Sequence, residues 1–182
     1  MIHRLLLAGT GLLTLLGCAS SPVMTDFDPA ADFASYRSFA FLEPQPVVAA
    51  PPDLSPLIPP RIVNATRSEL VAKGYVETED GAEADLIVSF TLGARDRVQV
   101  TEYPSYYQRG PNDWGAPYYD EVDVRSYTEG TLAIDLFDVK KQAPVWHGKT
   151  SRAITNKIRE NPAETIREAV AEIMAEYPPK AD

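Results

Sequence analysis

Two long stretches of the sequence alternate between apolar and polar residues, and this alternation limits the chain to folds built around a β-sheet. Residues 85–95 and 122–138 both repeat with a period of two, which places every second side chain on the same face of a strand. Residues 98–103 are expected to continue the first strand, and residues 144–152 to return as the hairpin partner of the second, with Trp146 buried. The side chains expected on the buried face of the two long strands are Leu86, Val88, Phe90, Leu92, Leu132, Ile134 and Leu136.

Two segments with helical spacing lie on either side of these strands. The first runs from about residue 59 to residue 73, and Gly74 follows it, as expected for a residue that must adopt positive φ beyond a helix end. The second opens after Asn161 and has an apolar stripe that ends at Tyr177. With a first strand at residues 36–41, the chain predicts an α+β domain, with a mostly antiparallel sheet and two helices packed on one face.

The first eighteen residues have the pattern of an export signal. A short basic start is followed by an apolar run of twelve residues, Leu5 to Leu16. As a helix this run would rise only about 18 Å, which is too short for a hydrocarbon core of about 30 Å. Leu16, Gly17 and Cys18 then resemble the end of a bacterial lipobox, in which the cysteine thiol receives diacylglycerol.

These features divide the chain into three parts. Residues 1–17 are the predicted signal peptide, residues 18–26 a lipidated tether that starts at Cys18, and residues 27–182 a single α+β periplasmic domain. The residue after the cysteine is Ala19 and not aspartate. By resemblance to other lipoproteins of double-membraned bacteria, this implies an outer-membrane anchor, with the domain on the periplasmic face.

Composition argues against several classes of function. The net charge of −9 disfavours nucleic acid as a partner. Cys18 is the only cysteine, and beyond the signal His147 is the only histidine, which disfavours a catalytic triad or a zinc site. The chain has no phosphate-binding glycine motif. We therefore expect no cofactor, no metal and no enzymatic activity.

The stretch from residue 103 to residue 119 is unusually rich in aromatic residues, interleaved with proline and glycine. Long connections of this kind tend to be functional, and aromatic side chains offer rigid contact area. One interpretation is a binding surface for a glycan, a peptide or another envelope protein; the other is a hairpin connection whose tyrosines pack on the sheet. The candidate surface residues are Tyr106, Tyr107, Trp114, Tyr118 and Tyr119.

Acidic residues in or beside the same stretch allow a second kind of function. Asp113 and Asp120 lie near Trp114, and two carboxylates beside aromatic residues are the minimum for cleaving a glycosidic bond. Asp120, Glu121 and Asp123 lack the spacing of a recognised calcium loop.

A set of short motifs resembles a known family. The motifs span residues 26–179 and include Asp32-Phe33, Lys73-Gly74-Tyr75, Ala84-Asp85-Leu86-Ile87-Val88, Gly130-Thr131-Leu132-Ala133-Ile134-Asp135-Leu136 and Val145-Trp146-His147-Gly148. In their order and spacing they resemble the uncharacterised bacterial lipoproteins grouped as domain of unknown function 4136. The resemblance implies a lipid-anchored periplasmic domain and brings no catalytic residue.

The leading hypothesis is therefore a non-enzymatic envelope protein that acts as a binding or assembly-accessory module. Its N-terminal lipid would hold it to the membrane. Its expected partner is an envelope protein or a glycan, and not nucleic acid. The alternative is a periplasmic glycan-acting hydrolase that uses the carboxylates near residues 103–119.

Overall fold

The structure is a computed structural model that describes residues 23–45, 55–103 and 121–180. It contains one six-stranded mixed sheet in the order β1-β6-β5-β4-β2-β3, in which β2 runs parallel to β3 and β4 and the other neighbours are antiparallel. The predicted α+β class and the mostly antiparallel sheet are confirmed. The elements are β1 (Val23–Phe27), β2 (Ser38–Phe41), α1 (Ile58–Ala72), β3 (Val76–Glu77), β4 (Leu86–Tyr103), β5 (Glu121–Asp138), β6 (Ala143–Ala153), α2 (Asn156–Glu160) and α3 (Pro162–Ala175).

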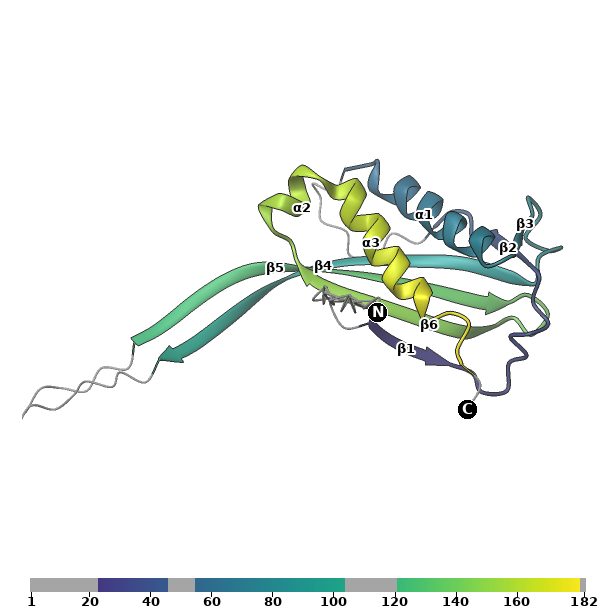
Figure 1. Ribbon diagram of the computed structural model, residues 1–182, viewed down its shortest axis with the longest axis horizontal. Coiled ribbons are helices and arrows are strands. Elements are labelled where there is room, and N and C mark those ends of the chain that lie inside the picture. The colour runs from purple at the N-terminus through teal and green to yellow at the C-terminus, as the bar shows by residue number, and fades with distance from the viewer. Residues whose placement is uncertain (1–22, 46–54, 104–120, 181–182) are drawn as a thin grey trace, which may run out of the picture.

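The two long helices, α1 and α3, pack side by side on one face of the sheet (Figure 1). Between them and the sheet lies the core, which contains the side chains predicted from the alternation: Leu86, Val88 and Phe90 of β4 face Leu132, Ile134 and Leu136 of β5, and all six are buried. Burying a side chain of this size contributes roughly 1.5–3 kcal/mol.

Aromatic side chains close the core at the end where the chain terminates. Tyr177 follows α3, is 1% exposed and packs edge-on against Trp146 of β6 and Phe33. Its hydroxyl lies 3.2 Å from that of Tyr75, and burial raises the pKa of the Tyr177 phenol. This contact joins the C-terminal segment to the residues just after α1.

Two carboxylates fix the N-terminal segment to the strand ends. Asp85 accepts hydrogen bonds from the backbone N–H groups of Arg37 at 2.9 Å and Ser38 at 3.1 Å, and these bonds hold the pKa of Asp85 below its usual range. Asp138 is buried, which by itself would raise its pKa. The backbone N–H of Lys141 and the hydroxyl of Tyr36, which donates across 2.8 Å, more than offset burial and lower it.

The domain begins earlier than the sequence predicts. Residues 23–26, expected in the tether, belong to β1, which pairs with residues 146–150 of β6 at the edge of the sheet. A five-residue edge strand with exposed polar positions leaves little periodicity to detect. Cys18 and the rest of residues 1–22 lie outside the described residues.

A third helix was also missed by the sequence analysis. Helix α2 has only five residues, begins after Thr155, and has Thr155 Oγ1 accepting a hydrogen bond from the N–H of Ile158 at 3.4 Å. One and a half turns are too few to show an apolar period of 3.6 residues. None of the helices in the described part of the chain is long and apolar enough to cross a membrane.

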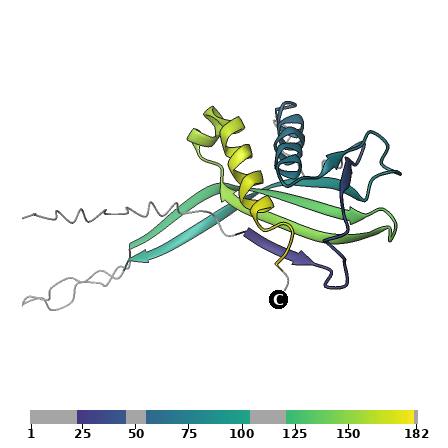
Figure 2. The same cartoon turned by 45° about the vertical axis from the view of Figure 1, so that its right-hand side comes forward.

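The hairpin of β4 and β5 extends well beyond the rest of the sheet. The two strands pair without a shift from Leu86–Asp138 to Tyr103–Glu121, but β6 reaches only as far as Glu129 of β5. Both views show the outer part of the hairpin projecting away from the helices and the other strands (Figures 1 and 2). We call this two-stranded part, residues 95–103 and 121–128, the arm.

A substitution at Gly148 tests the packing of the core. A Cβ atom at this position of β6 would lie 2.9 Å from Cζ2 of Trp146 and 2.8 Å from Cγ2 of Ile173, so the indole or helix α3 would have to move. We expect Gly148→Ala to lower the free energy of unfolding by about 2 kcal/mol or more in chemical denaturation.

Gly93→Ala is the matched control for this substitution. Gly93 lies in β4, and an added Cβ there meets no atom within 4 Å. The control should change stability by less than about 0.5 kcal/mol. Equal effects of the two substitutions would show that Trp146 does not pack as described.

Candidate functional site

Most of the residues singled out from the sequence lie outside the described part of the chain. This applies to Cys18, to the five aromatic side chains at positions 106, 107, 114, 118 and 119, and to Asp113 and Asp120. Residues 104–120, which include the five aromatic residues, Asp113 and Asp120, lie in the sequence between the two strands of the arm.

The arm itself presents two different faces. Residues at even positions of β4 share a face with buried Leu86 and Phe90, and on the arm they include Val98 and Val100. Val100 pairs with Val124 across the ribbon, and the exposed fractions of Val98, Val100 and Val124 are 66%, 56% and 61%. We call these three residues the valine row. Exposed apolar side chains gathered on one face of a ribbon are a feature of interaction surfaces.

The opposite face of the arm is charged and internally paired. Glu129 accepts hydrogen bonds from Arg95 at 2.7 Å and from Arg97 at 3.2 Å, and these arginines lower the pKa of its carboxyl. Arg125 pairs with Asp123 at 2.8 Å. Charged side chains on a long exposed ribbon discourage edge-to-edge aggregation. The arm therefore directs its apolar contacts to one face.

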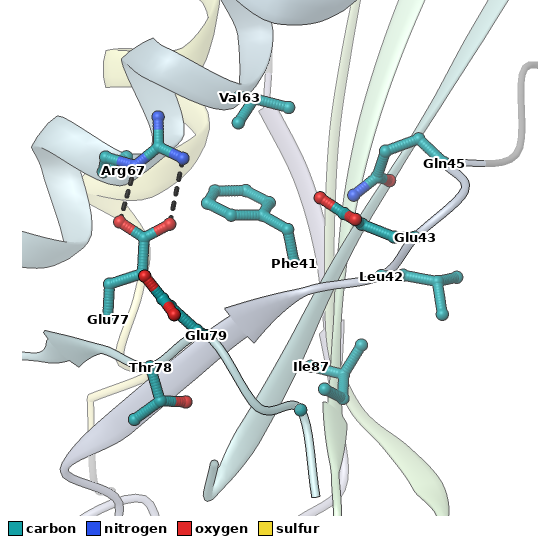
Figure 3. Close-up of a pocket in the computed structure, with 11 residues that line it drawn as sticks. Phe41, Leu42, Glu43, Gln45, Val63, Arg67, Glu77, Thr78, Glu79 and Ile87 are labelled. Atoms are coloured by element: carbon teal, nitrogen blue, oxygen red, sulfur yellow. Dashed lines mark hydrogen bonds and ion pairs between the residues drawn. The ribbon is translucent and has the colours of Figure 1, made fainter. Parts of the chain in front are cut away.

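A cavity of about 840 Å³ lies between α1, β2 and β3 (Figure 3). One wall is Arg67, whose guanidinium group donates to both carboxylate oxygens of Glu77 at 2.6 and 2.9 Å and to Asn64, and lies 5.2 Å from the centre of the Phe41 ring. The charge of Arg67 is thus compensated within the protein. This cavity could not be predicted from the sequence. Its wall combines Arg67 of α1 with Glu77 of β3, which come from separate segments of the chain.

A second, smaller cavity lies where the arm leaves the body of the protein. Its volume is about 150 Å³, and it is enclosed by β4, β5 and β6 on one side and by the three helices on the other. Its lining is mostly apolar and includes Ile62, Leu92, Leu132, Ile154, Ile158 and Ile166. Two polar side chains of β6, Thr150 and Arg152, also line it.

His147 lies on the open face of the sheet, away from the helices. Its Nδ1 atom is 2.6 Å from Oδ1 of Asp135, and the strand register places Ser89 on the other side of that aspartate. A nucleophilic triad needs the histidine between serine and aspartate. Here the aspartate is in the middle, so the arrangement does not activate Ser89. Nor does any group of three or more potential metal-ligating side chains occur among the described residues.

Comparison with known proteins identifies the family. The family model described as "Domain of unknown function (DUF4136)" matches residues 23–179. The chain belongs to the DUF4136 family. The resemblance seen in the sequence motifs is confirmed, and the match begins at the first residue of β1.

Solved structures share this DUF4136 fold. A DUF4136 family protein from Bacteroides thetaiotaomicron has a TM-score of 0.55 at 21% identity, with 87% of this chain and 96% of that chain covered. A PDZ domain protein from Parabacteroides distasonis has a TM-score of 0.56 at 15% identity over 89% of this chain, which spans only 36% of that longer protein. The PelC dodecamer from Paraburkholderia phytofirmans is more distant, with a TM-score of 0.49 at 14% identity over 86% of this chain and 96% of that one. No curated protein matches the sequence.

The polar end of the smaller cavity leads to a prediction on stability. Thr150 is 3% exposed, and its hydroxyl has no hydrogen-bond partner among residues 23–45, 55–103 and 121–180. Because an unpaired buried hydroxyl costs about 1–3 kcal/mol, Thr150→Val, which keeps the shape, should raise the free energy of unfolding by about 1 kcal/mol. Chemical denaturation of the purified protein measures the change.

Ser151→Ala is the neighbouring control, because the hydroxyl of Ser151 lies 2.7 Å from that of Thr131 on the other face of the sheet. Removing this paired hydroxyl should lower stability by about 1 kcal/mol. A loss of stability in Thr150→Val would show that its hydroxyl is satisfied.

Proposed function

We propose that this DUF4136 protein is a lipid-anchored, non-enzymatic module on the periplasmic face of the outer membrane, which binds an envelope protein through its projecting arm. The observation that carries the proposal is the valine row, three largely exposed valines on a ribbon that no other described element covers. Their burial against a partner would be favourable, whereas the same ribbon contributes nothing to the core of its own domain.

A protein is favoured over a glycan as the partner of the arm. Sugar rings are typically held by stacking on aromatic faces and by hydrogen bonds to hydroxyl groups, and a valine offers neither. Valine side chains bury well against other aliphatic side chains. A backbone with unpaired edges on both sides, as in residues 95–103 and 121–127 among the described residues, can also accept a further strand from a partner.

The anchor supports the same function from the other end of the chain. The apolar run of residues 5–16 followed by Gly17 and Cys18 carries the proposal of lipidation. Each buried methylene group contributes about 0.8 kcal/mol, so several acyl chains hold a protein firmly in a bilayer. Strand β1 starts at Val23, only five residues after Cys18, so the lipid would hold the domain close to the membrane surface.

The anchor is tested by Cys18→Ser in the full-length chain, expressed in a double-membraned bacterium. We expect the wild-type protein to incorporate radioactive palmitate and to sediment with outer membranes, and the variant to do neither. Ser21→Ala, three residues away, is the control and should behave as wild type. A variant that still matures at the same position and remains in the membrane pellet would refute the lipid anchor.

The arm is tested by a pair of double substitutions on its two faces. Val98→Ser with Val100→Ser removes most of the valine row, and Gln99→Ser with Thr101→Ser changes the alternate positions of the same strand. After crosslinking in cells, quantitative mass spectrometry should show a specific protein captured at least fivefold less by the valine variant and equally by the control. If both variants capture that protein as wild type does, the arm is not the interface.

A further inference from the structure

The small cavity at the base of the arm has the properties of a binding site for one side chain. Its volume of about 150 Å³ is that of a space that holds a benzene-sized group. Leu92 and Leu132 form its floor on the sheet, and Ile158 and Ile166 its roof on the helices. A leucine or phenylalanine side chain matches this volume and this lining.

The cavity also has a polar end that is prepared for a ligand. Four buried side-chain nitrogen or oxygen atoms lack a partner in the described part of the chain, and two of them, Oγ1 of Thr150 and Nε of Arg152, belong to residues that line this cavity. Buried polar groups are normally paired, and exceptions are concentrated at functional sites. Thr150 is almost completely buried, with an exposed fraction of 3%.

The charge around Arg152 determines which group can fill this end. Nη2 of Arg152 donates to Glu172 at 2.6 Å, and Nη1 lies 3.9 Å from Glu168. Since the positive charge is already compensated, an anionic ligand would face two carboxylates. The free Nε–H and the threonine hydroxyl instead suit a neutral hydrogen-bond acceptor such as a peptide carbonyl.

Leu92, Ala94 and Leu132, which line the cavity, share a face of the ribbon with the valine row. Ala94 of β4 and Gly130 of β5 pair at its edge, and further along the strand the next residues on this face are Asp96, hydrogen-bonded to Thr128 at 3.0 Å, and Val98. From Leu92 to Val100 is eight strand residues, about 27 Å. An extended peptide of about eight residues covers this distance.

We infer that the cavity takes one bulky apolar side chain of an extended peptide segment of a partner protein, and that a neighbouring main-chain carbonyl of that segment accepts a hydrogen bond from the hydroxyl of Thr150. This inference rests on the proposed function, because it treats the arm as part of the same interface. Three exposed valines alone fall far short of the roughly 1,000 Å² that a specific protein interface buries, so the partner must also insert a side chain into the cavity.

The experiment uses the full lipidated protein in nanodiscs and a defined probe. The probe is an uncharged, capped octapeptide that alternates leucine and threonine, with one leucine replaced by photo-leucine. We expect saturable binding by fluorescence polarisation, and photo-crosslinks that map to Ile154, Ile158 or Ile166. The same peptide with alanine in place of every leucine should bind at least tenfold more weakly, because it leaves the cavity unfilled.

Two variants test the two ends of the cavity. Thr150→Val removes the hydroxyl without changing shape, and Ala94→Phe fills the entrance; each should weaken peptide binding at least fivefold. Ser151→Ala, whose side chain lies on the other face, should leave the affinity unchanged. Unchanged binding by the folded Thr150→Val protein overturns the inference, whether or not Ala94→Phe folds. Tighter binding of methyl decanoate, in competition with the peptide, would assign the cavity to an acyl chain and also overturn it.

The result is separable from the test of the proposed function. If Thr150→Val still captures the crosslinked envelope protein and no peptide labels the cavity, the arm remains the interface and only the cavity assignment fails. If the peptide labels the cavity but Val98→Ser with Val100→Ser captures the envelope protein as wild type does, the arm proposal fails on its own.

Discussion

The uninterrupted register between β4 and β5 is the constraint on which the rest of the structure depends. Eighteen residues of each strand pair from Leu86–Asp138 to Tyr103–Glu121 without a bulge, so the inner and outer halves of the hairpin share the same two faces. On the inner half, one face is buried by α1 and α3. On the outer half, the same alternation leaves valines in water. The core thus fixes which face of the arm is apolar.

The boundary between the two halves lies at Glu129. Strand β6 ends opposite this residue, and Glu129 at that point binds Arg95 and Arg97. These ion pairs lie on the solvated face, where they contribute little to stability, but they place charged side chains on the ribbon where its neighbouring strand ends. Their effect is to hold the base of the arm and to leave the valine row as its free apolar face.

The long strands and helices could be predicted from the sequence. How far each strand extends beyond its neighbours in the sheet could not. Period-two alternation identified the buried faces around Phe90 and Ile134, and Gly74, with φ of 91°, marked the end of α1 as expected. The same alternation runs through Val98 and Val124, because a covered strand and a bare one obey the same pattern. What leaves the arm bare is that β6 has only eleven residues and turns into α2. The cavity behind Leu92 arises from that same turn and has no local sequence signal.

Two buried polar side chains, Asp138 and Thr150, are satisfied to different degrees. At the far end of the sheet, Asp138 is buried and accepts hydrogen bonds from the nearby Lys141 N–H and from the hydroxyl of the distant Tyr36, which compensate for its desolvation. At the base of the arm, Thr150 is equally buried and makes none. We expect a valine there to be more favourable for folding alone, because it would remove the unpaired hydroxyl. The unpaired hydroxyl of Thr150 is explained if a carbonyl group of a ligand accepts its hydrogen bond. The valine row lies on the same face of the ribbon as the cavity that contains this hydroxyl.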